Sequence, residues 1–414
     1  MKRAVIAALV AWAALASPAA AAGEIVLELW DGITATDGLG IEELVNRFNQ
    51  EHAGRIRVER TPTVWEELYP KVAVAVAGGV APDIWIMHRE NVPTQVLNGV
   101  LQPIDEYFEE AGLTDDHFLP GLAEGGFYGG RRYTVPMDVH PLLLYYNANH
   151  IAEAGLPGPP SNSAEHLEWA RKLTRRDGDQ VRWGARIISW GWLSWSILRQ
   201  FGSAAFGGEN FEDVVIMSEG TRRALEYAYD MVHTFQLSGP SWMFDGNVSM
   251  QADGIWWLGE VQRLRSEGGL NIHVAPADRI FGDVQPAVFA CSHMFSFPRQ
   301  TRIDPERMRA AFTFIKWMGA HNAEWATYGQ LPAWREAATS AEFRQMEDHM
   351  KIAFQAFDFP PPVPWGQSHL QIEQMFEMVI GGEGAPAVAM EQAHHALTVH
   401  RDEIRRQMEE APGL

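Results

Sequence analysis

Hydrophobic positions change their spacing in a regular order at the start of the chain. The segment 24–30 reads as a strand, and Ile41, Leu44, Val45 and Phe48 then recur at helical spacing. The segments 55–60 and 81–87 read as two further strands, and a helical pattern from Trp65 to Ala77 separates them. This order predicts βαβ units, which build a parallel sheet.

Two polar loops follow predicted strands of this sheet. They cover residues 31–38 and 88–92. Ligands of parallel sheets bind beyond the carboxyl ends of the strands, so these loops are candidates for ligand contact. A solvated surface loop is the alternative for any single residue in them.

The stretch 129–147 has a glycine turn, a short strand pattern, Pro136 and then a long apolar run that ends at Asn147. Pro136 fixes its own φ and drives Val135 into an extended conformation, so the chain passes this point as a rigid extended segment. The segment is either a crossing between domains or an ordinary strand corner. A similar apolar run over 288–298 is a candidate for a second crossing.

Aromatic residues gather at two places in the second half of the chain. A predicted strand over 183–188 leads into Trp190, Trp192 and Trp195, and Trp256 and Trp257 stand between two glycines. Tryptophan faces can stack on sugars, but most tryptophans pack cores. Helical patterns over 367–380 and 386–408 close the chain.

Composition indicates an ordered chain of more than one domain. Of the 414 residues, 46% are hydrophobic and 21% charged, which argues against disorder, and the length favours two cores. The formal net charge of −20 disfavours nucleic acid as a partner. Cys291 is the single cysteine, so no intrachain disulfide can form.

The N-terminus has the pattern of a secretory signal peptide over residues 1–22. Lys2 and Arg3 precede an apolar run that ends in small residues, with cleavage expected between Ala20 and Ala22. We therefore expect an exported protein that does not insert into the membrane.

The sequence motifs give little support for an enzyme, a cofactor site or a metal site. The G-x-G-x-x-A string at 382–387 follows a helical pattern rather than a strand, so it is discarded as a dinucleotide site. Glu391, His394, His395 and His400 form no recognised ligand motif, and we expect neither a metal nor a cofactor. A separated carboxylate pair such as Glu67 with Asp138 leaves a glycosidase open.

Several strings, in this order and spacing, resemble the type 1 extracellular solute-binding proteins of ABC importers, the sugar-binding group that includes maltose-binding protein. The resemblance covers the chain after residue 22. The strings that carry it are the strand into Trp30, residues 65–72, 79–84, 133–147, 154–157 and 329–333, and the Gly381-Gly382 turn.

The resemblance implies an α/β, two-lobe periplasmic-binding-protein fold of type II. Each lobe would hold a mixed, mainly parallel sheet flanked by helices, and hinge crossings would join the lobes around a ligand cleft. The crossings would lie at Val135 to Val139, near Ala290 to His293, and before Leu331. The N-terminal lobe would then comprise residues 23–136 and 291–327, and the C-terminal lobe residues 137–290 and 328–414.

Ligand residues are also implied by the resemblance. They should combine hydrogen-bonding groups with flat apolar faces, and Thr34 stands where maltose-binding protein has an acidic residue, which argues against a maltodextrin. Trp334 and Arg335 would close the far wall. The expected ligand residues are Thr34, Glu67, Arg89, Glu90, Asp138, His140, Trp190, Trp192, Trp256, Trp257, Trp334 and Arg335.

The function implied is capture of a small carbohydrate or sugar-like polyol in the periplasm, by a monomer that catalyses no reaction and delivers the ligand to a membrane-embedded ABC permease. Two alternatives stay open. One is an anionic glycerol or sugar derivative, such as a glycerophosphodiester or sulfonate, read by Arg335 or Arg89. The other is a secreted glycosidase.

Overall fold

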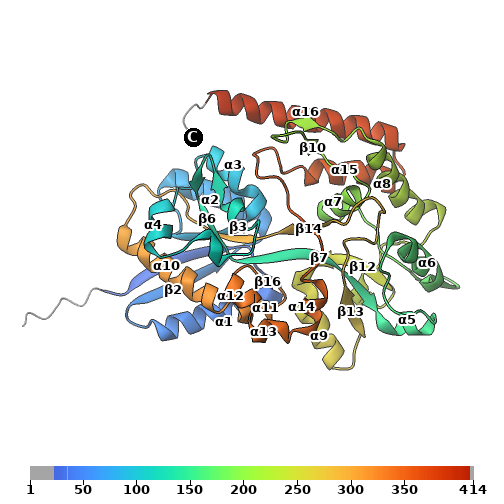
Figure 1. The fold of residues 1–414 in the computed structure, drawn as a ribbon, viewed down its shortest axis with the longest axis horizontal. Helices are drawn as coiled ribbons and strands as arrows, with labels where there is room; N and C mark the ends of the chain where they lie inside the picture. Colours follow the sequence, from blue (N-terminus) through green and yellow to red (C-terminus); the bar gives the residue numbers. More distant parts are fainter. Residues whose placement is uncertain (1–22, 35, 411–414) are drawn as a thin grey trace, which may run out of the picture.

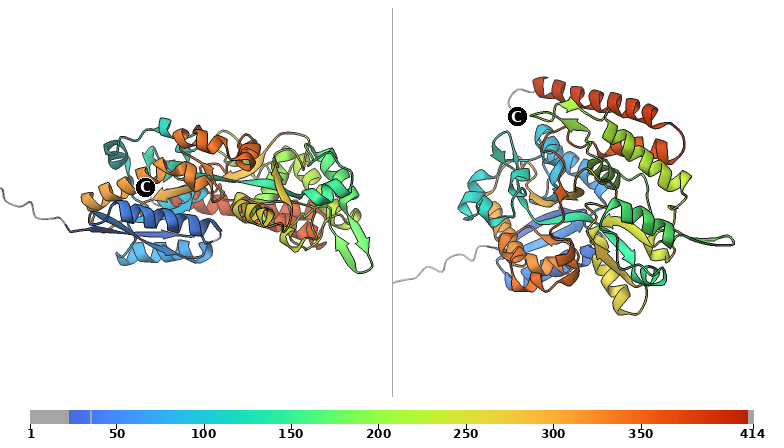
Figure 2. Two further views of the ribbon diagram at one scale, coloured as in Figure 1. Left: turned by 90° about the horizontal axis from the view of Figure 1, so that it is seen from below. Right: turned by 45° about the vertical axis from the view of Figure 1, so that its right-hand side comes forward.

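The computed structural model describes residues 23–34 and 36–410, and the predicted signal peptide lies outside them. Two lobes, each built around its own sheet, lie side by side along the long axis (Figure 1). The strand β7 runs from between the lobes far into the second one. Figure 2 shows the same division from two further directions. Among the described residues, no helix has the length and hydropathy needed to cross a bilayer.

The first lobe contains a five-stranded sheet in the order β2-β1-β3-β15-β6. β1 pairs in parallel with β2 and β3, as the sequence pattern predicts, whereas β15 pairs antiparallel with β3 and β6. The strands of this sheet are β1 (Ile25–Asp31), β2 (Ile56–Pro62), β3 (Ile84–His88), β6 (Thr134–Pro136) and β15 (His293–Ser296).

The second sheet is organised around β7, and every pairing of β7 is antiparallel. The expectation of a mainly parallel sheet is therefore wrong for this lobe. β12 and β13 pair with the same part of β7 from its two sides, and β7 enters between them in the opposite direction. The strands are β7 (Asp138–Asn147), β12 (Met250–Gly254), β13 (Ile272–Ala275), β14 (Val288–Cys291), β16 (Leu331–Pro332) and β17 (Phe357–Asp358).

The chain passes between the two sheets at single residues. β6 ends at Pro136 and β7 begins at Asp138, while β14 ends at Cys291 and β15 begins at His293. The two passages are adjacent, because β14 pairs with β7 and β15 pairs with β6. Short extended segments of this kind can act as hinges, since few backbone angles need to change.

Helices cover both sheets, and their buried faces follow the apolar spacing of the sequence. In α1, for example, Ile41, Leu44, Val45 and Phe48 are all buried. The helices are α1 (Thr36–Glu51), α2 (Trp65–Gly78), α3 (Val92–Leu97), α4 (Asp105–Glu110), α5 (Ala148–Glu153), α6 (Ser163–Leu173), α7 (Gly191–Gln200), α8 (Glu219–Tyr229), α9 (Leu258–Ser266), α10 (Pro305–Ala320), α11 (Asn322–Ala326), α12 (Arg335–Ala338), α13 (Ala341–Arg344), α14 (Glu347–Ile352), α15 (His369–Ile380) and α16 (Pro386–Glu410).

Short elements complete the chain. They are the two-stranded hairpins β4–β5 (Phe127–Tyr128, Arg131–Arg132), β8–β9 (Arg175–Asp177, Gln180–Arg182) and β10–β11 (Phe206–Gly207, Asp213–Val214), and the single-turn helices η1 (Arg89–Asn91), η2 (Asp115–His117), η3 (Ala123–Gly126), η4 (Asp230–Thr234), η5 (Met243–Asp245) and η6 (Ile255–Trp257). The strand expected over 183–188 is reduced to isolated bridges at Trp183, Ala185 and Arg186.

The segment that begins at Leu331 packs differently from the expected lobe division. Trp334 contacts Phe118 edge-to-face, and the backbone of Leu119 donates a hydrogen bond to Ala333. α12 therefore lies against the first lobe, although residues 328–414 were expected in the second. α15 and α16 pack on α8 in the second lobe, and α16 runs along the outer edge of the molecule (Figure 1).

Candidate functional site

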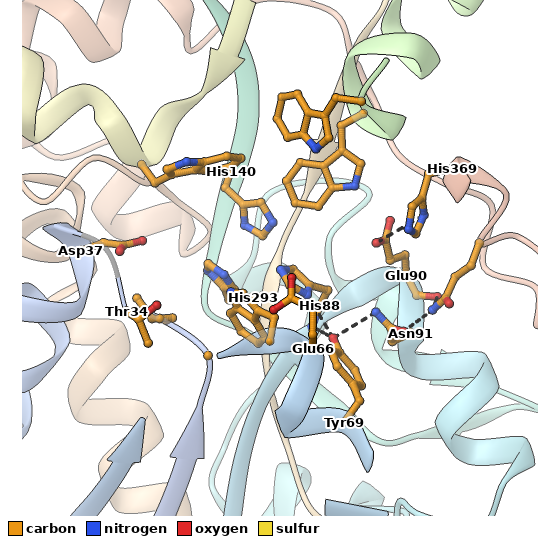
Figure 3. Close-up of a pocket in the computed structure, with 17 residues that line it drawn as sticks. Thr34, Asp37, Glu66, Tyr69, His88, Glu90, Asn91, His140, His293 and His369 are labelled. Carbon is orange, nitrogen blue, oxygen red and sulfur yellow. Dashed lines mark hydrogen bonds and ion pairs between the residues drawn. The ribbon is translucent and has the colours of Figure 1, made fainter. Parts of the chain in front are cut away.

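A cavity of about 560 Å³ lies where the two sheets meet, beyond the carboxyl ends of β1 and β3. Both lobes supply its walls, and Figure 3 shows the side chains converging from opposite sides. The lining residues are Gly32, Ile33, Thr34, Asp37, Trp65, Glu66, Tyr69, His88, Glu90, Asn91, His140, Trp190, Trp192, Trp256, His293, Gln367 and His369.

The loop after β1 is fixed by a buried ion pair. The guanidinium of Arg60 binds both carboxylate oxygens of Asp31 at 2.7 Å and also the carbonyl of Ile33. This bracing presents Thr34 and Asp37 to the cavity. A Cβ on Gly32 would collide with the ring of Trp65, so the loop approaches α2 closely only because residue 32 is glycine.

Asp37 and Glu90 are buried carboxyl groups with unused acceptors. Gln330 donates to Oδ2 of Asp37 at 2.8 Å, whereas Oδ1 of Asp37 and Oε2 of Glu90 have no hydrogen-bond partner among the described residues. Burial raises the pKa of Asp37 to about 6 and raises that of Glu90 as well. Buried acceptors of this kind gain free energy when a ligand hydroxyl donates to them.

The wall after β3 is braced by a polar network around Tyr69. Its hydroxyl accepts from the backbone N–H of His88 at 3.1 Å and lies 3.0 Å from the side-chain amide of Asn91. The amide of Gln367 in turn donates to the side chain of Asn91 and to the carbonyl of Glu90. This network joins the first lobe to the segment before α15, so both lobes contribute to one wall.

Tryptophans form the second-lobe wall. Trp190 and Trp192 lie at the start of α7 with their ring centroids 5.5 Å apart, and Trp256 of η6 meets both rings edge-on. Trp192 also stacks on Phe289 of β14 at 4.7 Å, which fixes its ring. Across the cavity, Trp65 contributes a fourth indole.

The cavity floor rests on the fully buried carboxylate of Asp138. It accepts hydrogen bonds from the backbone N–H of His293 at 3.0 Å and from the indole of Trp325 at 2.9 Å. Nδ1 of His293 and Nδ1 of His140 lie 2.7 and 3.3 Å from its oxygens. Burial alone would raise the pKa of Asp138 and lower that of His293, but their mutual attraction reverses both shifts.

The structure brings six of the twelve expected ligand residues to the cavity, which are Thr34, Glu90, His140, Trp190, Trp192 and Trp256. Asp138 lies beneath the floor and is occupied by the contacts just described. Arg89 is buried and donates to the carbonyl of Pro360 at 3.0 Å. Glu67 is exposed on α2 outside the lining.

The remaining three expected residues also lie outside the cavity lining. Trp257 faces a separate hollow with Trp242, Arg186 and Asp253. Trp334 is 8% exposed, and its indole donates to the carbonyl of Pro136. Arg335 donates to the carbonyls of Asp116 and Phe118. The expected far wall of Trp334 and Arg335 is therefore a packing contact of the first lobe.

The expected set omitted nine residues that line the cavity beside its loop backbone, namely Asp37, Trp65, Glu66, Tyr69, His88, Asn91, His293, Gln367 and His369. Some of these residues could have been identified from the sequence. His88 and Asn91 fall in a loop that the strand pattern marked, and His293 is the last residue of the second predicted crossing. Gln367 and His369 come from the far end of the chain, where helical spacing alone says nothing of a ligand.

The fold and the cavity together define a two-lobed ligand-binding protein of the periplasmic-binding type. The chain belongs to the bacterial extracellular solute-binding protein family, whose model matches residues 43–351. Among curated relatives, the maltotriose-binding protein of Pyrococcus abyssi is 24% identical over 270 residues, which is 61% of this chain and 53% of the relative.

A second curated relative is the sn-glycerol-3-phosphate-binding periplasmic protein UgpB of Pectobacterium atrosepticum, 27% identical over 203 residues, or 47% of this chain and 44% of the relative. The chain thus spans about half the length of the curated relatives it matches. Those relatives are named as binding proteins and not as enzymes.

Two solved structures are similar over nearly the whole chain. The GacH receptor of Streptomyces glaucescens, solved unliganded and with acarbose, has a TM-score of 0.80 at 20% identity, with 92% of this chain and 99% of that chain covered. A solute-binding protein from Thermotoga lettingae bound with α-D-tagatose has a TM-score of 0.77 at 20% identity, with 91% and 100% covered. At this identity the likeness establishes the fold, which is the type II periplasmic-binding-protein fold.

Proposed function

We propose that this chain is the substrate-binding component of an ABC importer and that it captures a small carbohydrate or sugar-like polyol. The observation that carries the proposal is the pairing of buried, unused carboxylate oxygens on Asp37 and Glu90 with the indole faces of the same cavity. Ring hydroxyls can donate to such oxygens while the apolar face of a sugar stacks on tryptophan.

Capture proceeds by hinge closure about the passages at Met137 and Ser292. The ligand stabilises the closed state because it contacts both lobes at once. In the proposed cycle the protein is exported by its signal peptide, works as a periplasmic monomer, catalyses no reaction and presents both closed lobes to a membrane-embedded permease.

A neutral polyol is favoured over an anion by the charge of the lining. Its acidic members are Asp37, Glu66 and Glu90, the charge of His293 is paired with Asp138, and no lysine or arginine occurs among the described residues that line the cavity. Arg89 and Arg335, the two residues that would have read an anion, are engaged elsewhere. The names of the UgpB relatives keep an anionic glycerol derivative as the second candidate.

A ligand panel tests the proposal. Thermal unfolding is followed with mono- and oligosaccharides, polyols and sn-glycerol-3-phosphate, since a ligand at 100 times its Kd adds about 2.7 kcal/mol of stability. A neutral sugar or polyol should raise the midpoint and give one site per chain in calorimetry. A response to sn-glycerol-3-phosphate alone would favour the second candidate, and release of product from a chromogenic glycoside would overturn both.

A further inference from the structure

Three histidines from three strands meet at the cavity floor. His88 ends β3, His293 begins β15 and His140 lies in β7. His88 and His293 are direct cross-strand neighbours, and the ring centroids of His140 and His293 are 4.2 Å apart. Candidate donor atoms of the three side chains all lie within 4.8 Å of one another, and Figure 3 shows the rings grouped at the centre of the cavity.

In each ring, one nitrogen lies within hydrogen-bond distance of an oxygen and the other makes no hydrogen bond among the described residues. Nδ1 of His293 and of His140 face the carboxylate of Asp138, and Nδ1 of His88 lies 3.0 Å from the hydroxyl of Tyr69. In the described part of the chain, Nε2 of these rings makes no hydrogen bond, and Nε2 of His140 is fully buried as well. A network that only braced the strands would leave this buried nitrogen unexplained.

This arrangement matches the outer shell of histidine metal sites. Histidine ligands commonly bind metal through one ring nitrogen while the other donates to a carboxylate or other oxygen, which fixes the tautomer and the orientation of the ring. Coordination through Nε2 would place the proton on Nδ1, and Asp138 can accept it from His140 and His293. Tyr69 orients the ring of His88 through its contact with Nδ1.

The donor set selects the class of ion. Three imidazole nitrogens suit Zn²⁺, Co²⁺, Ni²⁺ or Cu²⁺, whereas Mg²⁺ and Ca²⁺ prefer oxygen ligands. Three protein ligands also leave a coordination position open, as in zinc sites that exchange a water or a substrate. That position would face the cavity, because the rings of Trp65 and Trp192 lie next to the histidines.

We propose that His88, His140 and His293 bind one divalent transition-metal ion at the floor of the cleft. The ion joins β3 and β15 of the first sheet to β7 of the second. The open position accepts an oxygen of a small ligand. Metal binding does not depend on the proposed carbohydrate, because the three nitrogens and their outer shell are sufficient for it.

The test uses the full purified protein, stripped with EDTA and dialysed, and titrated with ZnCl₂ in a calorimeter. One equivalent should bind, and His88→Gln and His140→Gln should each lower the affinity at least about 100-fold, since loss of an outer-shell partner alone costs 10–100-fold. Co²⁺ should give a visible absorption band that both variants lose. His395→Gln, on the exposed face of α16, is the matched control and should bind Zn²⁺ like the parent.

Thermal unfolding without metal identifies any variant that fails to fold. If the more buried His140→Gln fails to fold, the Zn²⁺ affinity of His88→Gln alone tests the proposal. Unchanged Zn²⁺ affinity in folded His88→Gln would overturn the proposal. A loss confined to His395→Gln would also overturn it, because it would place the binding on α16. Competition by Mg²⁺ at equal concentration would contradict a nitrogen site. Sugar binding, measured separately, can fail without affecting any of these outcomes.

Discussion

Asp138 and His293 form a buried ion pair directly after the two passages between the sheets, with Oδ2 and Nδ1 2.7 Å apart. Asp138 opens β7 and His293 opens β15, so the pair joins the two sheets at the point where the lobes would pivot. The neighbouring backbone strengthens the link, because Met137 donates its N–H to the carbonyl of His293 at 2.8 Å. The pair therefore fixes the relative position of the two strands at the hinge.

We expect Asp138→Asn to destabilise the fold by about 3–5 kcal/mol, because a buried charge loses its partner. Urea unfolding at pH 7 measures the change. Glu110→Gln removes the partner of Arg309 in an exposed pair and is the control, with a much smaller effect expected. Equal losses in the two variants would contradict a structural role for the buried pair.

Asp37 should make stability fall as pH rises from about 4 to 6. Burial raises its pKa from 3.8 to about 6, so in this range the folded state binds more protons than the unfolded state. The cost is absent below pH 4, complete above pH 6, and corresponds to about 3 kcal/mol.

Asp37→Asn should therefore be more stable than the parent at pH 8, by up to about 3 kcal/mol, and nearly equal to it at pH 4. Urea unfolding of both proteins at several pH values gives the difference, in which other titrating groups cancel. A difference that does not change with pH would show that Asp37 ionises normally in the folded state.

Glu66 and Glu67 are a matched pair on α2, of which the structure places only Glu66 in the cavity. Glu66→Gln should weaken binding of the best panel ligand about 10- to 100-fold, since hydrogen bonds to charged groups contribute about 1.5–3 kcal/mol. Glu67→Gln should bind like the parent. Calorimetry compares the two, and the opposite order would restore the sequence-based choice of Glu67.

The same pair shows how far sequence reasoning extends. Helical spacing correctly predicted α2, but neighbouring positions on a helix point about 100° apart. Choosing between Glu66 and Glu67 needs the rotation of α2 against β1, which is set by Trp65 packing over Gly32. The local sequence pattern predicts the helix but not this tertiary contact.

Tertiary contacts also explain the other differences between the sequence-based predictions and the structure. The apolar runs around Pro136 and Cys291 located the passages between sheets, because long buried strands have a readable pattern. Arg335 looked equally suited to a ligand, yet it binds backbone carbonyls of a segment more than 200 residues earlier. The partner of a long side chain cannot be read from its own neighbourhood in the sequence.

Trp256 and Trp257 separate ligand stacking from packing, because these adjacent tryptophans face different hollows. Trp256 lines the main cavity, whereas Trp257 packs against Trp242 at 5.0 Å and lines the other hollow. Trp256→Ala should weaken sugar binding about 10- to 100-fold through loss of a stacking face.

Trp257→Ala should lower the midpoint of thermal unfolding and leave the affinity of the folded protein unchanged. Calorimetry at a temperature where both variants are folded makes the comparison. Equal affinity losses would mean that the ligand extends across the rim into the second hollow. If neither variant lost affinity, sugar stacking on η6 would be excluded and the second-lobe contact would have to come from Trp190 and Trp192 at the start of α7.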